Sequence, residues 1–166
     1  MSATTTLPSP LGPLTLVADG GALTAVWFDA DDRPAPAPAP APVPAPPDAA
    51  DAVLAAARGQ LEEYLAGERR EFDLPLRPAG TPFQQRVWAS LREIPYGETL
   101  GYGALASRIG RPGAARAVGL ANGRNPLAIV VPCHRVVGAS GALTGYGGGL
   151  ERKRLLLELE ARVARW

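Results

Sequence analysis

Cysteine and histidine are almost absent from this chain, which has one of each among 166 residues. A single cysteine excludes a disulfide within the chain, and this favours a reducing compartment. One cysteine and one histidine also cannot make the usual Cys/His ligand set of a metal site, so no metal is expected. Lysine is equally scarce, with one residue against sixteen arginines.

Long hydrophobic runs are missing as well. No segment approaches the roughly 18 to 20 consecutive apolar residues that cross a bilayer. Residues 1–5 have neither the basic patch nor the apolar core of a signal peptide. With 46% hydrophobic and 20% charged residues, the chain can bury a sizeable core as one domain or two small ones. We therefore expect a globular, cytoplasmic protein with no membrane partner.

Negative charge is scarce in the second half of the chain. Residues 1–80 carry eleven acidic residues and five arginines, a net charge of −6. Residues 81–166 carry eleven arginines, one lysine and five glutamates, a net charge of +7. This asymmetry favours a polyanion as the partner of the C-terminal half. A general bias towards arginine on solvated surfaces explains it equally well, so the charge alone does not decide.

The only cysteine and the only histidine are neighbours, Cys133 and His134, and they follow the apolar run 129–131. The run predicts a short buried strand that ends at the pair. An imidazole can take the proton of a thiol, and the thiolate is the reactive nucleophile. The alternative is an inert buried cysteine beside an unrelated histidine.

The N-terminal part is rich in residues that favour strands. The runs 14–18 and 23–28, joined by Asp19-Gly20-Gly21, predict a hairpin within a strand meander over residues 3–30. Eight of the fourteen residues in the segment 34–47 are proline, which predicts an extended, solvated proline-alanine loop.

The second part of this region changes character. Apolar residues at helical spacing predict a helix over 51–65, and alternation predicts a short strand over 72–76. The composition shifts near residues 78–80. We therefore expect an α+β fold: a small N-terminal β-meander and helix domain, residues 1–78, followed by a mostly helical C-terminal domain, residues 79–166.

The C-terminal half predicts a helix-turn-helix outline. Thr81 and Pro82 form an N-terminal cap for a helix that runs to about Ile94. Two short helices, 102–109 and 114–121, are separated by a Gly/Pro turn. The same pattern is typical of any αα-hairpin. The second short helix has a smooth face of small residues, from which Arg116 stands out as a cation that could reach into a groove.

A strong final helix is predicted over 150–165, with leucines and Val163 towards the core. On this helix Glu160 could reach back to His134, or it could be an ordinary solvated carboxylate. The preceding loop, 138–149, is rich in glycine and carries one aromatic residue, Tyr146. It lacks the spacing and the lysine of a phosphate-binding loop, so we interpret it as a flexible wall over the cysteine.

The motif Pro132-Cys133-His134-Arg135-Val136 resembles the active-site motif of the O6-alkylguanine-DNA alkyltransferases. Other motifs of that family occur in the same order and spacing: Pro95-Tyr96-Gly97-Glu98 with Tyr102, Ala114-Ala115-Arg116-Ala117-Val118-Gly119, Asn125-Pro126 and Gly148-Gly149-Leu150. The resemblance is close over residues 80–162. The N-terminal part is similar only in outline, and the proline-alanine segment is a departure.

The resemblance implies a role for each matching residue at the site. Cys133 would accept the alkyl group, His134 would act as its base through a water, and Glu160 would orient the imidazole. Asn125 would brace the site, and Tyr102 would donate a proton to the departing purine. The substrate base would be read by the backbone of Val136 and Gly147 and lined by Tyr146.

The resemblance also implies how DNA would be bound. Arg116 would replace the extruded nucleotide in the stack, because a base inside the duplex is beyond the reach of the thiol. The small-residue helix would enter the minor groove. The DNA-binding residues expected on this basis are Ala114, Ala115, Arg116, Ala117, Gly119 and Arg135.

The implied function is DNA repair by direct reversal. One alkyl group would move irreversibly from O6-alkylguanine, and O4-alkylthymine is a further candidate, to the cysteine of one protein molecule. The implied partner is double-stranded DNA with that lesion, no cofactor is needed, and a monomer in solution that can cluster on DNA is expected. Three alternatives remain: a lesion-binding module without transfer, a cysteine hydrolase and a transcription regulator.

Overall fold

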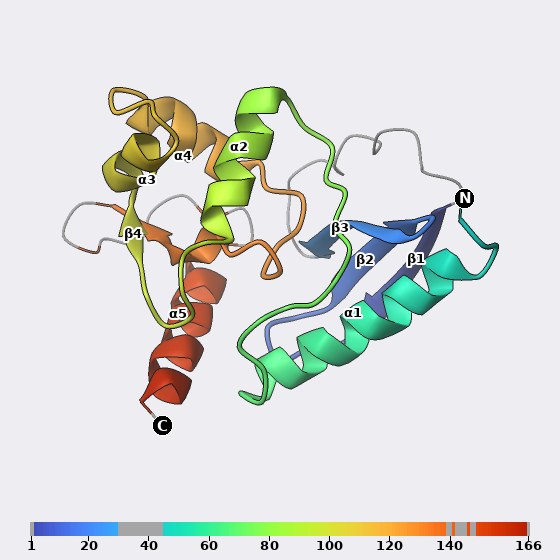
Figure 1. The fold of residues 1–166 in the computed structure, drawn as a ribbon. Coiled ribbons are helices and arrows are strands. Elements are labelled where there is room, and N and C mark those ends of the chain that lie inside the picture. Colours follow the sequence, from blue (N-terminus) through green and yellow to red (C-terminus); the bar gives the residue numbers. More distant parts are fainter. Residues whose placement is uncertain (1, 30–44, 139–140, 142–145, 147–148, 166) are drawn as a thin grey trace. The chain divides into compact units, whose positions relative to one another are not determined.

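The computed structural model describes residues 2–29, 45–138, 141, 146 and 149–165 (Figure 1). The chain forms two compact units. The first comprises Met1–Ala79 with Pro126–Val130, and the second comprises Gly80–Asn125 with Val131–Trp166. The predicted α+β fold is confirmed. The domain boundary expected near residue 79 stays a prediction, and the compact units add that Pro126–Val130 packs with the N-terminal sheet.

The first unit is built on a three-stranded antiparallel meander. Strands β1 (Ser2–Leu7), β2 (Leu14–Asp19) and β3 (Ala22–Phe28) lie in the order β1-β2-β3, as the sequence pattern predicts. The hairpin between β2 and β3 turns at Gly20, whose φ of 60° is easily reached only without a Cβ. Buried and half-buried residues alternate along β2, so one face of the sheet is the core face.

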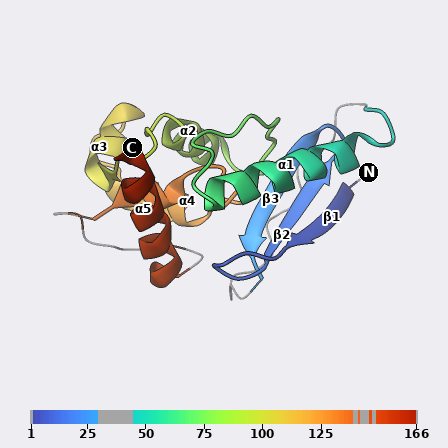
Figure 2. The same ribbon diagram turned by 90° about the horizontal axis from the view of Figure 1, so that it is seen from below.

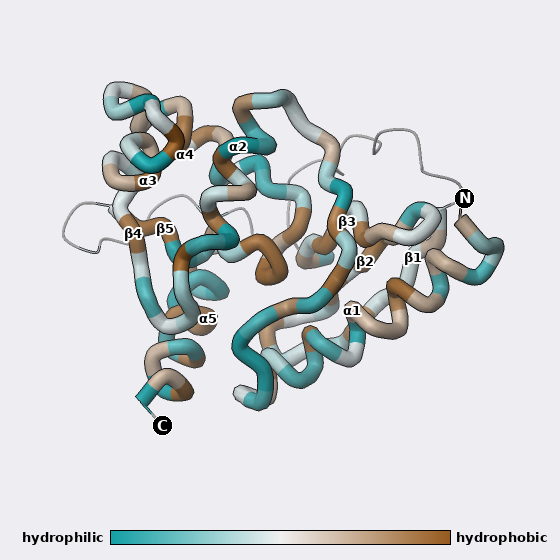
Figure 3. The backbone as a smooth tube through the Cα atoms, viewed as in Figure 1, coloured by the Kyte–Doolittle hydropathy of each residue, from teal (hydrophilic) through white to brown (hydrophobic). Residues whose placement is uncertain are grey.

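Helix α1 (Ala49–Leu65) lies along this sheet and contacts all three strands (Figure 2). Its apolar residues recur at helical spacing, and Figure 3 shows hydrophobic and hydrophilic residues alternating along it. Ala57, Leu61 and Tyr64 are fully buried. These buried side chains contribute to the core of the first unit. The helix begins two residues before the predicted one.

The outer edge of β3 is covered by two segments from elsewhere in the chain. Leu23 exchanges backbone hydrogen bonds with Pro75 and Arg77, and Val26 does so with Pro126 and Ala128. The predicted strand over 72–76 is wrong, because only one isolated bridge forms, between Leu76 and Leu23. The pairing leaves few open backbone groups on β3, which protects it from association with other chains. Most of the predicted proline-alanine loop lies outside the described residues.

The second unit is mostly helical, and its first helix is α2 (Pro82–Leu91). The Thr81 hydroxyl accepts from the backbone N–H of Gln84, and the Gln84 side chain accepts from the backbone N–H of Thr81. This capping box confirms the predicted start. The helix ends three residues earlier than predicted, followed by a tight turn at Ser90–Ile94.

Helices α3 (Tyr102–Arg108) and α4 (Ala115–Gly123) pack against each other and against α2 (Figure 1). The turn between them uses Gly110 at a φ of 77°. The indole N–H of Trp88 on α2 donates to the carbonyl oxygen of Ala121 at 2.9 Å. The two helices around a turn are therefore present as predicted.

The remaining elements are a short 3-10 helix η1 (Cys133–Arg135), strand β5 (Val136–Val137) and the final helix α5 (Leu150–Ala164). Strand β5 pairs in parallel with β4 (Leu100–Gly101). On α5 the fully buried residues include Lys153 and Glu160, whereas Leu155 and Val163 are only half-buried. Among the described helices none is long and apolar enough to cross a membrane.

The segment before the cysteine is not the strand that the apolar run predicts. Residues 128–130 form turns and residue 131 a bend. The backbone N–H of Val130 donates to Ala128 around Ile129, whose φ of 70° makes this a strained γ-turn. The prediction was wrong because burial, which it inferred correctly, does not distinguish a strand from buried turns.

Candidate active site

Cys133 and His134 begin the short helix η1, directly after an inverse γ-turn. Pro132 has φ −80° and ψ 64°, and the backbone N–H of Cys133 donates to the carbonyl oxygen of Val131 at 2.8 Å. The proline ring restricts φ to this region, so the local sequence favours the turn. The exposed fraction of Cys133 is 5% and that of His134 is zero. Because so little of the thiol is exposed, a bulky substrate has to reach below the protein surface to contact it.

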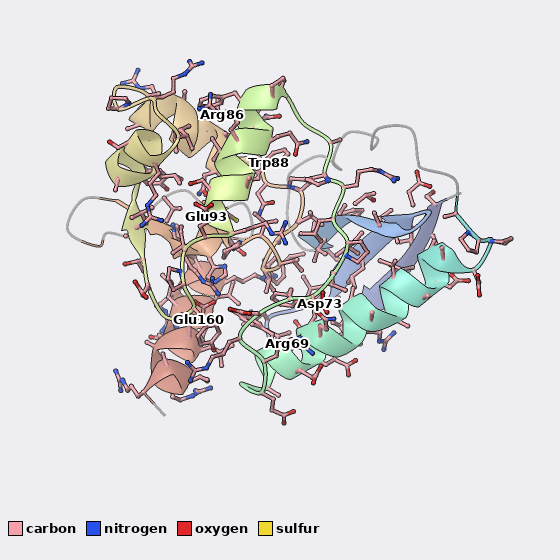
Figure 4. All side chains as sticks on the ribbon, in the orientation of Figure 1. Arg69, Asp73, Arg86, Trp88, Glu93 and Glu160 are labelled. Carbon is pink, nitrogen blue, oxygen red and sulfur yellow. The ribbon has the colours of Figure 1, made fainter. Side chains whose placement is uncertain are left out.

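Glu160 from α5 is the partner of His134. His134 Nε2 lies 2.7 Å from Glu160 Oε2, and both side chains are buried (Figure 4, where Glu160 is labelled). The pairing of imidazole and carboxylate expected from the resemblance is therefore present. With Nε2 donating its proton to the carboxylate, the lone pair of the neutral imidazole is on Nδ1.

Two further groups donate to Glu160. Arg135 Nε lies 2.8 Å from Oε1 and Arg135 Nη2 lies 3.0 Å from Oε2, while the backbone N–H of Gly97 donates to Oε1 at 3.2 Å. Burial raises the pKa of Glu160, but the hydrogen bonds and charges of His134 and Arg135 outweigh it and lower the pKa to about 2. Glu160 is therefore an anion at every physiological pH.

His134 is kept neutral by its surroundings. Burial lowers its pKa, the hydrogen bond and charge of Glu160 raise it, and the charges of Arg135 and Lys153 lower it again. The net result is a pKa below the ordinary value of 6.5. An uncharged imidazole can accept a proton, so His134 is in the form that a base requires.

Lys153 on α5 is a site residue that the sequence reasoning missed. Its side chain is fully buried, and Nζ donates to the carbonyl oxygen of Val136 at 2.5 Å. Burial lowers the pKa of Lys153, and the charge of Cys133 raises it. An ammonium group at this place would favour the thiolate form of Cys133. One feature of the sequence could have singled it out: it is the only lysine in a chain with sixteen arginines.

Two asparagines connect the end of α4 to the segment that carries the cysteine. Asn125 Nδ2 donates to the carbonyl oxygen of Val131 at 2.8 Å, next to the inverse γ-turn. Asn122 Nδ2 lies 3.4 Å from the carbonyl oxygen of Cys133. Both amides are buried. The brace expected of Asn125 has a matching geometry, and Asn122, which the sequence reasoning did not identify, adds a second contact.

The predicted residues on α3 and α4 differ in exposure. Tyr102 begins α3 and is half-buried, with its ring against Gly119, where an added Cβ would lie 3.5 Å from the ring carbons. Arg116 and Ala117 are exposed, whereas Ala114 and Ala115 are half-buried. The predicted DNA-binding residues of α4 therefore do not all share its exposed face.

The exposed face of α4 also includes residues that the sequence reasoning passed over. Leu120 is 63% exposed, and Arg124 is exposed one turn further along. Arg116 and Leu120 are four residues apart and lie in one row along the helix, and Arg124 is its C-terminal cap residue. An exposed apolar side chain between two cations is compatible with a groove of a polyanion.

The prediction that Arg135 contacts DNA is at odds with the structure. Its exposed fraction is 7%, and its guanidinium is committed to Glu160 and to the carbonyl oxygen of Ile94. A buried cation with these partners cannot reach a phosphate. Of the expected base pocket, Val136 is buried, Tyr146 is half-buried, and Gly147 lies outside the described residues.

The fold and the site together describe a protein whose chemistry centres on a buried thiol with a neutral imidazole and a carboxylate in support. Two family models match the chain and identify the kind of protein that it resembles. The ribonuclease-like domain of 6-O-methylguanine DNA methyltransferase matches residues 3–78, and the DNA-binding domain of the same protein matches residues 82–162.

Individual relatives agree along nearly the whole chain. The methylated-DNA–protein-cysteine methyltransferase of Mycobacterium tuberculosis is 56% identical over 156 residues, covering 93% of this chain and 90% of that protein. Its counterpart in Methanosarcina acetivorans is 50% identical over 155 residues, covering 92% and 94%. The structure of the M. tuberculosis OGT in complex with DNA superimposes with a TM-score of 0.81 at 53% identity, covering 95% and 92%.

The chain therefore belongs to the 6-O-methylguanine DNA methyltransferase family. The resemblance predicted from the sequence is confirmed, and with it DNA repair by transfer of an alkyl group to a protein cysteine.

Proposed function

We propose that Cys133 is the alkyl acceptor and that the substrate is O6-alkylguanine in double-stranded DNA. The observation that carries this assignment is the buried row of Cys133, neutral His134 and ionised Glu160, with His134 Nε2 at 2.7 Å from the carboxylate. The described residues contain no second cysteine that could serve as the acceptor.

The proposed reaction is a displacement at a saturated carbon. His134 takes the thiol proton at Nδ1, directly or through a water, and becomes an imidazolium stabilised by Glu160. The sulfur then forms a bond to the alkyl carbon while the bond from that carbon to guanine O6 breaks. The departing guanine receives a proton, for which Tyr102 is the proposed donor. Neighbouring Lys153 would stabilise the thiolate before attack.

Access requires the damaged nucleotide to leave the duplex, since the thiol is only 5% exposed. Flipping costs a few kcal/mol of stacking and pairing. We propose that Arg116 offsets this cost by occupying the vacated place in the stack, with Leu120 and Arg124 contacting the same groove. The flipped base would then be held by the backbone of Val136 and Gly147 and the ring of Tyr146, while Asn125 keeps the turn in place.

The product of this reaction is a thioether, which has no easy reversal and no second thiol to resolve it. One protein molecule would therefore repair one lesion and stop. We further propose that the protein acts as a monomer in the cytoplasm, and these two points rest on the sequence alone.

The decisive experiment is the intact mass of the protein after incubation with a duplex that contains O6-methylguanine. We expect one added methyl group per molecule, mapped to the peptide of Cys133, and no further reaction with excess DNA. Cys133→Ala should bind the lesion but gain no mass. A lesion-binding module would leave the wild-type mass unchanged, and many turnovers would refute the single-use mechanism. A parallel duplex with O4-methylthymine tests the wider substrate range.

A substitution at Arg116 tests the proposed flipping step. Arg116→Ala should slow transfer from a duplex by about tenfold or more, because its loss withdraws on the order of 1–3 kcal/mol of support for the extruded state. Transfer from free O6-benzylguanine base should be nearly unchanged, since nothing has to be flipped. Equal losses with both substrates would contradict the proposal.

A further inference from the structure

The Arg135 side chain is unusual among the arginines of this chain because it is buried beside the reactive pair. Burying an unpaired charge costs several kcal/mol, so such a group persists only with strong partners. The Nη1 atom donates to the carbonyl oxygen of Ile94 at 2.7 Å, and the guanidinium carbon lies 5.5 Å from the ring centroid of Tyr96. The other two nitrogen atoms, Nε and Nη2, each donate to Glu160.

The contact of Arg135 with Glu160 is bidentate and fixes the plane of the carboxylate. Arg135 Nε lies 2.8 Å from Oε1 and Nη2 lies 3.0 Å from Oε2, so neither oxygen can rotate away without breaking a charge-assisted hydrogen bond. The same Oε2 accepts a hydrogen bond from His134 Nε2 at 2.7 Å. The backbone N–H of Gly97 closes the arrangement on Oε1 at 3.2 Å.

We propose that Arg135 is a positioning residue, whose guanidinium holds the Glu160 carboxylate ionised and in the orientation that accepts Nε2–H of His134, so that Nδ1 carries the lone pair for the proton of Cys133. This role deepens the proposed function and rests on it. The guanidinium does not touch the substrate, and it acts only through Glu160 and His134.

The proton balance of the Glu160–His134 pair explains why the positive charge matters. A buried carboxylate and imidazole without a neighbouring cation gain a proton readily, either on the ring or on the carboxyl group. Either protonated state removes the base. The Arg135 cation opposes that proton, and the charge of Lys153 acts in the same direction.

The groups around His134 that could titrate or carry charge come from three places. Its own element η1 supplies Cys133 and Arg135, and α5 supplies Lys153 and Glu160. Tyr96 lies on the far side of the guanidinium. Helix α2 also packs on η1, and its buried residues, which the structure describes completely, contain no ionisable side chain: Val87, Trp88, Ser90 and Leu91.

A merely structural role is the competing explanation, since Arg135 also ties η1 to the end of the turn after α2. The two roles differ in their pH dependence. Loss of a structural contact slows transfer by the same factor at every pH. Loss of the proposed positioning raises the pH below which the Glu160–His134 pair holds an extra proton, so the acid limb of the rate profile moves to higher pH.

The test uses the single histidine, whose NMR signals need no assignment. In wild-type protein the ring nitrogens should show the Nε2–H tautomer. In Arg135→Gln the midpoint of the His134 titration and the acid limb of the single-turnover rate should move together to higher pH, with transfer at pH 7 slowed about 10- to 100-fold. Arg135→Lys keeps the charge but not the fork. It should keep the midpoint near that of wild type with a smaller loss of rate.

The matched control is Arg154→Gln on α5, the helix that carries Glu160, because Arg154 also pairs with glutamate but 43% of its side chain is exposed. It should leave the midpoint and the rate unchanged. The proposal is overturned if Arg135→Gln slows transfer equally at all pH values, if its midpoint stays in place, or if wild-type His134 is the Nδ1–H tautomer. Should Arg135→Gln not fold, the wild-type tautomer and the Arg135→Lys midpoint decide. Absence of transfer by wild-type protein would refute the proposed function, and the NMR result would still decide the role of Arg135.

Discussion

Helix α5 carries two clusters of arginine and glutamate that are chemically alike and differ in burial. On the outer side Arg154, 43% exposed, pairs with Glu151 and with Glu158 at 2.6 Å. On the inner side Glu160, 1% exposed, pairs with Arg135 and His134. The outer ions are solvated whether or not they meet. The inner ions have lost their water and depend on one another.

The difference teaches that an ion pair gains chemical influence from its surroundings. Water and salt screen the outer cluster, so it has little effect on stability or on neighbouring protons. The inner cluster lies where screening is weak. There burial and the neighbouring charges together shift the pKa of the carboxylate and of the imidazole.

The largest expected effect breaks the inner cluster. Glu160→Gln leaves the buried Arg135 charge without its counterion and replaces the charged acceptor of His134 with a neutral amide. We expect a loss of unfolding free energy on the order of 3–5 kcal/mol, measured by urea denaturation. Transfer should become slow or undetectable. Glu158→Gln is the matched change in the outer cluster and should leave both measurements near wild type; a comparable loss there would remove the distinction.

The next largest effect is expected on acidification, which should lower stability through the inner cluster and not through the outer one. The folded pKa of His134 is below its ordinary 6.5, so the unfolded chain binds that proton more readily, and stability should begin to fall below about pH 6.5. Glu160 has a folded pKa of about 2 against an ordinary 4.5, so its stabilisation is complete above 4.5 and is lost as the pH falls towards 2. Urea midpoints between pH 3 and 8 measure both stages.

Two variants serve as controls for the acid series. Glu160→Gln should remove the stage below pH 4.5, and Arg154→Gln should leave the whole profile as it is. A profile that is flat between pH 8 and 5 would contradict the neutral state assigned to buried His134.

A smaller effect is expected at Gly97, the fourth donor to Glu160. Its φ is 80°, and an added Cβ would lie 2.7 Å from the Cβ of Ala164. Gly97→Ala should therefore cost about 1–3 kcal/mol of unfolding free energy and slow transfer, because the loop must shift away from α5. Gly103→Ala on α3, where nothing lies within 4 Å of an added Cβ, is the control and should be neutral or slightly stabilising. Equal effects at the two glycines would refute the argument.

The smallest effect is expected when the outer cluster is removed. Arg154→Gln should leave the urea midpoint unchanged within error at moderate salt, because its pairs are exposed and screened. Repeating the measurement at low salt sharpens the comparison, since any contribution of Arg154 should appear only there. A clear loss at high salt would show that the outer cluster is more than a solvated face.

Much of the fold could be predicted from local patterns. The hairpin at Gly20, the capping box at Thr81 and the helices of both units follow from turn residues, caps and apolar spacing, which act over a few residues. The apolar run 129–131 misled the prediction because its burial comes from turns held by Asn125 and by the edge of β3. Those contacts are distant in sequence, and a local pattern does not contain them.

In the candidate site, too, some features could be predicted from local sequence and others depend on tertiary contacts. The adjacency of Cys133 and His134 and the family motifs pointed to the thiol and to Glu160. Arg135 was expected, on the basis of the resemblance, to contact DNA, and Lys153 was not considered at all. Residue type alone does not predict burial for either of them, since arginine and lysine are mostly exposed in proteins. Only their packing reveals that both are buried beside the reactive pair.

By itself the sequence determined which chemistry is available: one thiol, one imidazole next to it, and motifs that place both in a DNA alkyltransferase family. The tertiary structure decided the geometry in which Glu160 meets that imidazole, and it placed buried Arg135 and Lys153 in the same site. The physical reason is that a covalent neighbour is encoded in the chain, whereas the electrostatic environment of a group depends on which distant side chains exclude its water.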